Sequence, residues 1–146
     1  FQEFIVNYRT STQTNNLLAD LAMARTEAVK FARPVDIVAD GGGWGAGWTV
    51  GVDIDGNGAL AGADEIFRQQ GAAPDGTIMK GADAGGTAIT TITFSPTGEK
   101  TAPATDVEFA ICRPDRIDAK SRAIRLSAVG RALSQQGFSG FTVNCT

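Results

Sequence analysis

The stretch Leu18-Ala19-Asp20-Leu21-Ala22-Met23-Ala24-Arg25-Thr26-Glu27-Ala28-Val29-Lys30 decides the fold of this 146-residue chain. Apolar residues recur around it at intervals of three and four, at Leu17, Leu21, Ala24 and Ala28, which places them on one face of an α-helix. Residues 1–33 contain no glycine. Pro34 disfavours the α conformation of the residue before it, so the helix should end there. We predict one long helix over residues 1–33, with this apolar face packed on a sheet.

The first half of this helix is less regular than the second. Phe4, Ile5 and Tyr8 continue the helical spacing, but residues 10–16 are poor in strong helix formers. We therefore expect a bend or break there, with Thr14 or Asn15 as a second N-cap. A straight helix of 33 residues would be about 50 Å long, longer than the roughly 40 Å diameter of a compact chain of this size. One end, residues 1–6, should therefore protrude.

The rest of the chain reads as short strands separated by glycine-containing turns. Five of the 18 glycines cluster at residues 41–47, the other 13 follow residue 50, and none precedes residue 41. Apolar and β-branched runs predict strands at residues 35–38, 47–53, 65–68, 88–94, 107–112, 123–129 and 141–143. Turn residues lie between them at 55–58, 75–76, 95–98 and Gly130. One long helix (1–33) packed on an antiparallel sheet headpiece (34–146) of about seven short strands is an α+β fold, and we expect helix and headpiece to form one globular domain.

The residues that are absent exclude several classes of enzyme. The chain has no histidine, which removes Ser-His-Asp and Cys-His catalysis and histidine metal ligands. Its two cysteines are too few for a four-thiolate metal site. No nucleophile elbow, P-loop or complete dinucleotide-binding glycine motif is present. We therefore predict that the chain is not an enzyme and needs no cofactor.

Cys112 and Cys145 are the two cysteines of the chain. Their even number, their wide separation and the lack of a CxxC motif favour a structural disulfide over redox or metal chemistry. Such a bond indicates an oxidising compartment. Two free buried thiols in a cytosolic protein are the alternative.

The net charge of −3 conceals a basic C-terminal quarter. Residues 1–112 carry 14 acidic and 7 basic side chains, whereas residues 113–146 carry 2 acidic and 6 basic ones. Such a segment meets phosphate, an acidic neighbour or only water. The six basic residues are Arg113, Arg116, Lys120, Arg122, Arg125 and Arg131.

An acidic loop resembles a calcium-binding sequence. Asp53, Asp55, Asn57 and Asp64 take positions 1, 3, 5 and 12 of a D-x-D-x-N-G loop. Position 12 holds Asp64 in place of the usual bidentate glutamate, and no helices flank the loop. A tight acidic hairpin without an ion explains the same residues, because Asp-Gly and Asn-Gly form type I′ turns unaided. Calcium at this loop is therefore one of two hypotheses.

The helix quoted above resembles that of the FimT/GspH family, which comprises minor pilins of type IV pili (FimT, FimU) and the H-type pseudopilin of type II secretion. The order of the later segments is similar too. These segments are residues 44–50, 53–64, 94–98, 109–112 and 124–131, with a final Cys145. The resemblance therefore spans nearly the whole chain.

The resemblance implies a type IV pilin-like fold and a structural role. Members carry a hydrophobic N-terminal helix that anchors them in the bacterial inner membrane and later in the filament, so this chain would be a soluble, extracytoplasmic fragment without that anchor. The implied function is to help initiate or cap a pilus through contacts with major and minor pilins or pseudopilins. Service in type II secretion is an alternative.

A second alternative is DNA binding in natural transformation. Some FimT proteins bind DNA through a basic C-terminal segment with a Gly-Arg-x-Arg motif. Gly130-Arg131 matches its first half, but Leu133 replaces the second arginine. Binding through residues 113–131 would therefore be directed at the phosphate backbone and depend steeply on salt.

Overall fold

A computed structural model describes residues 1–62, 64–74 and 76–146 of the chain. The described residues form one α-helix, two short 3₁₀ helices and nine strands. In chain order these are α1 (Gln2–Phe31), β1 (Val35–Ala39), η1 (Trp44–Ala46), β2 (Trp48–Val52), β3 (Glu65–Gln70), β4 (Ile78–Asp83), β5 (Thr91–Phe94), β6 (Lys100–Ala102), β7 (Val107–Cys112), η2 (Asp118–Lys120), β8 (Arg122–Leu126) and β9 (Ala132–Gln136).

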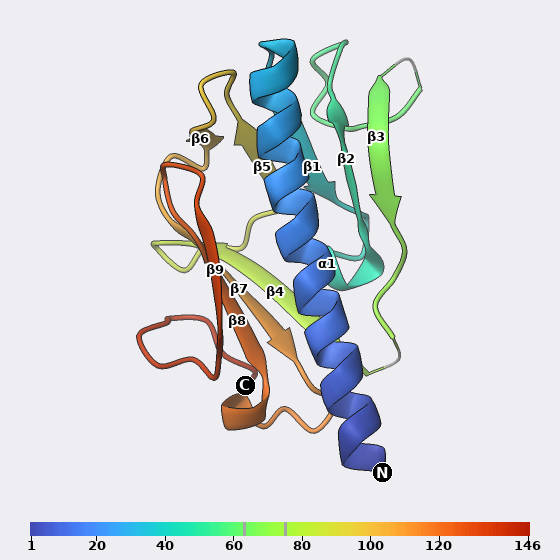
Figure 1. Cartoon of the computed structure of the whole chain (residues 1–146), viewed down its shortest axis with the longest axis vertical. Coiled ribbons are helices and arrows are strands. Elements are labelled where there is room, and N and C mark those ends of the chain that lie inside the picture. Colours follow the sequence, from blue (N-terminus) through green and yellow to red (C-terminus); the bar gives the residue numbers. More distant parts are fainter. Residues whose placement is uncertain (63, 75) are drawn as a thin grey trace.

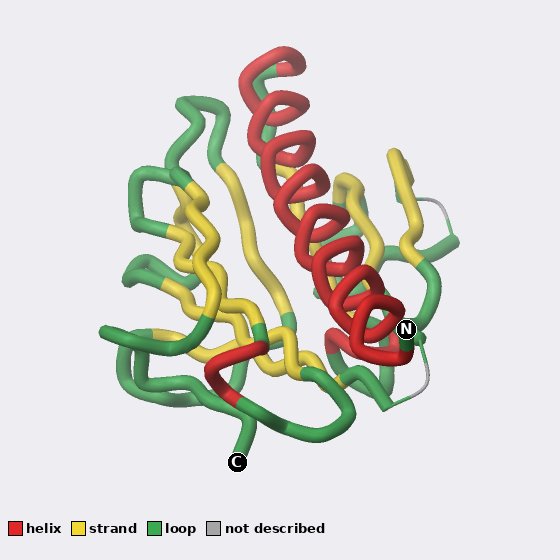
Figure 2. Tube along the Cα trace, turned by 60° about the horizontal axis from the view of Figure 1, so that its bottom comes forward, coloured by secondary structure: helices red, strands yellow, loops and turns green. Residues whose placement is uncertain are grey.

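The strands form two antiparallel sheets under a single helix. One sheet has the order β3-β2-β1-β5-β6 and the other the order β4-β7-β8-β9. In Figure 1 the first sheet lies mainly behind the upper, C-terminal half of α1 and the second behind its lower half. Figure 2 shows strands on both sides of the helix. The predicted α+β, pilin-like architecture is confirmed, with nine strands in place of about seven.

The side chains that α1 buries are mostly apolar in its C-terminal half and polar in its N-terminal half. Leu17, Leu21, Ala24 and Ala28 are at most 1% exposed and join a core with residues of both sheets. Nearer the N-terminus of α1, the buried side chains are those of Thr10, Gln13 and Thr14. The apolar residues predicted to face the sheet are therefore the ones that do so.

The predicted break in the helix is wrong, because α1 runs continuously through residues 10–16. Thr14 and Asn15, the predicted second N-caps, are therefore interior residues of the helix. The hydroxyls of Thr10 and Thr14 donate to the carbonyl oxygens of Val6 (2.9 Å) and Thr10 (2.8 Å), four residues earlier. Threonine can satisfy its hydroxyl inside a helix in this way, so a run of threonines need not interrupt it.

The prediction of strands is right for six of the seven segments, with shifts of one to three residues at several ends. The segment 141–143 is not a strand, and β4, β6 and β9 were not predicted. The turn predicted at residues 75–76 includes Asp75, which lies outside the described residues. In the segment predicted to protrude, Phe1 and Phe4 are 95% and 69% exposed, whereas Ile5 and Val6 are half-buried and Glu3 binds Arg113.

Candidate functional site

Arg113, the first of the six predicted DNA-contacting residues, is buried and fully paired. Its side chain is 3% exposed. Nη1 donates to Glu3 Oε1 and to Asn7 Oδ1, each at 2.7 Å, and Nη2 donates to Glu3 Oε2 at 2.8 Å and to Asp115 Oδ2 at 2.6 Å. This arginine therefore fastens the first two turns of α1 to the segment that follows β7.

The same contacts shift the pKa values of both partners. Hydrogen bonds from Arg113 and then from Lys120 lower the pKa of Glu3 to about 2. The carboxylates of Glu3 and Asp115 raise the pKa of Arg113 above its usual value. All three groups are thus charged across the physiological pH range, and we call this set, with Asn7 and Lys120, the Arg113 clamp.

Of the other five predicted DNA-contacting residues, two form ion pairs within the described part of the chain and three do not. Lys120 lies 3.0 Å from Glu3 Oε1. Arg125 donates to Glu108 Oε2 at 2.8 Å, and its guanidinium lies 4.3 Å from the centre of the Phe141 ring. Arg116, Arg122 and Arg131 belong to none of the ion pairs of the described residues. Half of the basic segment is therefore neutralised within the molecule.

The three remaining cations do not form one patch. Arg131 is exposed in the turn between β8 and β9, whereas Arg116 precedes η2 near the other end of β8, with Nη1 3.4 Å from the carbonyl oxygen of Cys145. Arg122 is half-buried at the start of β8. A polyanion would therefore meet separate charges along the length of a strand.

The structure brings together three of the four predicted calcium ligands. Carboxylate oxygens of Asp53, Asp55 and Asp64 lie within 4.8 Å of one another. The fourth, Asn57, donates its side-chain amide to Asp55 Oδ2 at 3.1 Å, and its side-chain oxygen accepts from Ala59. Ala63, within the same loop, lies outside the described residues.

Several of these carboxylate oxygens already accept hydrogen bonds from backbone amides. Asp53 accepts from the amides of Gly56, Asn57 and Gly58, and these bonds, that of Gly58 first, lower its pKa. The hydrogen bond from the amide of Asn57 would lower the pKa of Asp55, but Asp53, burial and Asp64 together outweigh it, and the net shift is upward. The loop is thus a tightly hydrogen-bonded acidic turn, whose charge a cation could neutralise.

The predicted disulfide is confirmed. Cys112 at the end of β7 bonds to Cys145, with the two Cα atoms 5.7 Å apart. The bond holds residues 138–145, the C-terminal strap, over the outer face of the second sheet, where both cysteines are buried with Ala110.

A buried glutamate fixes the middle of the C-terminal strap. Glu108 Oε1 on β7 accepts from the amide of Thr142 at 2.9 Å, from the hydroxyl of Thr142 at 2.7 Å and from the amide of Val143 at 3.3 Å. Burial raises the pKa of Glu108, but the bonds from Arg125, Thr142 and Val143 outweigh it, so the net shift is downward. The segment predicted as a strand at 141–143 is therefore held by a side chain and not by a sheet ladder.

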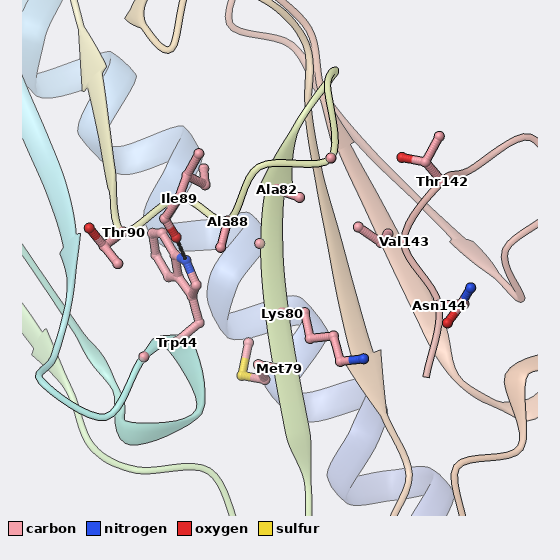
Figure 3. A pocket seen from close by; sticks show the side chains of 13 residues that line it. Trp44, Met79, Lys80, Ala82, Ala88, Ile89, Thr90, Thr142, Val143 and Asn144 are labelled. Carbon is pink, nitrogen blue, oxygen red and sulfur yellow. Dashed lines mark hydrogen bonds between the residues drawn. The ribbon is translucent and has the colours of Figure 1, made fainter. Parts of the chain in front are cut away.

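Sequence reasoning missed a cavity of about 470 Å³ that crosses β4. Figure 3 shows its lining, with Trp44 and Ile89 on one side of β4 and Val143 and Asn144 of the strap on the other. Trp44 Nε1 donates to the carbonyl oxygen of Ile89 at 2.8 Å, which fixes that wall. Lys80 is the one charged residue among its described lining residues, and its amine donates to the backbone oxygen of Thr146.

Arg25 of the quoted helix sequence joins both sheets. Its Nε donates to the carbonyl oxygen of Gly98, in the turn between β5 and β6, at 2.8 Å. Gly130, in the turn between β8 and β9, has φ +88°, and a Cβ there would lie 2.4 Å from the same oxygen of Gly98. Three segments quoted for the family resemblance therefore meet at one point, although the sequence alone gave no reason to connect them.

Aromatic side chains are exposed along the first two turns of α1. Phe1, Phe4 and Tyr8 are 95%, 69% and 64% exposed, and their spacing places them near one another on the helix surface. Among the described residues, no helix is both long enough and apolar enough to cross a membrane. Phe1, Phe4 and Tyr8 are the three most exposed large apolar side chains among the described residues.

Comparison with known proteins gives consistent matches. The family model described as "Type II transport protein GspH" matches residues 13–130. No curated protein matches the chain.

Solved structures match over most of the chain. The type IV minor pilin FimU of Pseudomonas aeruginosa aligns with 98% of this chain and 99% of its own, with 25% identity and a TM-score of 0.73. A second crystal form of FimU gives a TM-score of 0.71. The minor pseudopilin EpsH from the type II secretion system of Vibrio cholerae aligns with 88% of this chain and 97% of its own, with 11% identity and a TM-score of 0.66. The EpsH match shows a shared fold.

Proposed function

We infer the role of this chain from the family to which it belongs, the GspH family of pilin-like type II transport proteins. We propose that it is a minor pilin that helps initiate or cap a type IV pilus through contacts with other pilin-type subunits. The observation that carries the proposal is the match to the minor pilin FimU along 98% of the chain. The identity to FimU, 25%, is also higher than the 11% shared with the secretion pseudopilin EpsH.

The structure supplies a physical basis for such contacts. Phe1, Phe4 and Tyr8 expose apolar area that becomes favourable to bury only against another molecule. The Arg113 clamp holds these turns in one orientation, so their burial would cost little conformational entropy. A rigid, apolar helix end is well suited to pack against the helices of neighbouring subunits.

Deletion of the gene tests this function. We expect loss or strong reduction of surface pili, counted by electron microscopy, with the major pilin still present in the membrane. Complementation with the Phe4→Asp, Tyr8→Asp variant should fail, whereas Ile66→Asp, a change of an exposed apolar residue on β3, should restore pili. Normal piliation in the deletion strain would contradict the proposal.

Service in type II secretion is the first alternative, and the same deletion strain distinguishes it. A pseudopilin role predicts loss of exoprotein secretion with normal pili. The family model and the shared fold with EpsH support this alternative.

DNA binding is a second alternative, and exposed Arg131 together with Arg116 supports it. We expect any binding to be backbone-directed and to weaken steeply with salt. In gel-shift titrations at low salt, Arg116→Ala with Arg131→Ala should reduce retention, whereas Arg9→Ala, an exposed arginine on α1, should not. An absence of any complex at low salt would exclude this alternative.

Calcium binding at the acidic loop is a further proposal, which rests on the proximity of Asp53, Asp55 and Asp64. An ion bound only by the folded state raises stability by about 2.7 kcal/mol at a hundredfold excess over its Kd. Millimolar calcium should therefore raise the melting temperature of the chain but not that of Asp53→Asn. An equal melting temperature with and without calcium would reject the site.

A further inference from the structure

The four edge strands of the two sheets are β3, β6, β4 and β9, and three of them carry features that oppose pairing with another chain. β3 contains charged Glu65 and Arg68 and pairs to β2 with a register shift. β6 has only three residues. The edge of β4 is partly occupied, since Gly81 accepts from the amide of Ile89 at 3.0 Å. Natural sheets use such devices to prevent unwanted strand addition.

β9 has none of these devices. It comprises Ala132–Gln136, without charge, proline or bulge, and pairs with β8 in one continuous register. Its residues are half-buried or exposed, and Leu133 is 60% exposed. A five-residue, uncharged and accessible strand of this kind can accept another strand.

The pattern of backbone hydrogen bonds between β8 and β9 shows which backbone groups of β9 face away from β8. The amide of Ser127 donates to the carbonyl oxygen of Arg131 at 2.9 Å, and the amide of Gly137 donates to that of Ser121 at 2.8 Å. Because bonded pairs alternate in an antiparallel ladder, residues 131, 133, 135 and 137 direct their backbone groups to β8. The N–H and C=O groups of Ala132, Ser134 and Gln136 therefore point to the open edge.

The side chains around this edge indicate the chemistry of an incoming strand. Leu133 is registered opposite Arg125, on the outer face of the sheet. Arg131 lies in the turn just before β9 and lines a groove with Ala22 and Arg25 of α1. Arg131 is exposed and has no carboxylate partner among the described ion pairs. An incoming strand with an apolar residue beside Leu133 and a carboxylate beside Arg131 would complement both.

We propose that β9 accepts an extended strand from a neighbouring, non-identical pilin-type subunit, which continues the β4-β7-β8-β9 sheet. This inference rests on the proposed function, because subunits held side by side in a filament need only a weak edge contact to pair. A second copy of this chain is a poorer occupant. In two-fold pairing centred on Ser134, Arg131 would face Gly137 of the copy and would gain no carboxylate.

Photocrosslinking in the pilus-producing cell tests the proposal. A benzoylphenylalanine residue placed at Leu133, with the same residue at Ile66 on β3 as the matched control, would report what lies beside each edge. We expect a product from position 133 only, in which the linked peptide belongs to another pilin-type subunit.

Changes at Ser134 test whether the contact is made by the backbone. Ser134→Pro removes one outward N–H and no bond to β8, and it should lower the crosslink yield about fivefold, as expected for one hydrogen bond. Ser134→Ala keeps the N–H and should leave the yield unchanged. Ser134→Lys keeps both the N–H and the hairpin, but it adds an edge charge and should also lower the yield.

Each outcome decides the proposal. A product with a second copy of this chain, an equal yield from positions 133 and 66, or an undiminished yield in both Ser134→Pro and Ser134→Lys would overturn it. Melting temperatures of the purified variants would show whether a lost crosslink reflects unfolding, and in that case the Ser134→Lys result decides. If the deletion strain keeps normal pili, the minor-pilin function fails, whatever the crosslinking result.

Discussion

Arg113 keeps its charge at a position that is 3% exposed because the carboxylates of Glu3 and Asp115 compensate it and the side-chain oxygen of Asn7 accepts a further hydrogen bond. A buried cation without partners would be strongly unfavourable. The bidentate pair with Glu3 joins residues that are 110 positions apart. The residue therefore stabilises the end of the helix more than it offers charge to a ligand.

Replacement of Arg113 by methionine should consequently destabilise the fold. We expect the free energy of unfolding to fall by about 2–3 kcal/mol, somewhat less than for a fully buried pair, because Glu3 and Asp115 both reach water. Arg131→Met, an exposed arginine in no ion pair of the described residues, should change it by less than about 0.5 kcal/mol. Urea denaturation measures both, and equal effects would show that the Arg113 clamp contributes no stability.

The pKa of Glu3 predicts how the Arg113 clamp responds to acid. The carboxyl group has a pKa of about 2 when folded, against 4.5 ordinarily. A lowered pKa means that the carboxylate stabilises the folded state above pH 4.5 and that this contribution disappears as the pH falls toward 2.

The melting temperature of Glu3→Gln should therefore lie below that of the parent chain at pH 6, with the difference closing between pH 4.5 and 2. Glu99→Gln, an exposed control, should show no such convergence. A difference that stays constant down to pH 2 would indicate that Glu3 acts through packing and not through its charge.

Among the helices and strands, the sequence predicted those whose own residues show a clear apolar pattern. The helix follows from Leu17, Leu21, Ala24 and Ala28, and β7 from an apolar run that only Glu108 interrupts. β9 was missed because its Ser-Gln-Gln end lacks apolar alternation, and its pairing with β8 decides its structure. Segment 141–143 has the composition of a strand, yet Glu108 binds it instead. The Glu3–Arg113 and Glu108–Thr142 contacts could not be predicted, since each depends on the tertiary approach of distant segments.

The disulfide and Glu108 hold the C-terminal strap at two separate points, in addition to contacts of the strap with Arg125 and Asp118. Replacing both cysteines with serine should lower the free energy of unfolding by about 3–4 kcal/mol, the chain-entropy value for a loop of 33 residues. The amides of Thr142 and Val143 should nevertheless stay protected from hydrogen exchange, because their bonds to Glu108 remain. Adding Glu108→Ala should release them. Loss of protection in the cysteine variant alone would show that the disulfide is the only effective attachment.

At the scale of the whole molecule, α1 is the element that connects the two sheets. It contacts β1, β2 and β5 of one sheet and β7, β8 and β9 of the other. Arg25 adds a polar connection between the helix and the turns at Gly98 and Gly130. The core likewise mixes residues of both sheets, such as Ile37 of β1 and Ile124 of β8, around Leu21. The main hydrophobic core is therefore shared by both sheets, and only a small cluster around the disulfide belongs to the second sheet and the strap alone. This sharing favours the prediction that helix and headpiece behave as one domain.

Leu21→Ala tests this prediction directly. Leu21 is 1% exposed, so truncation should cost about 2–5 kcal/mol. Because the core is shared, the loss should appear equally in both sheets, as the same decrease in hydrogen-exchange protection for the most protected amides of β2 and β8 and as a single unfolding transition. Ala22→Gln, on the exposed face of α1, should leave both sheets unchanged. Two transitions, or a loss confined to β1, β2 and β5, would mean that the β4-β7-β8-β9 sheet folds independently of the helix, held by its disulfide and Glu108.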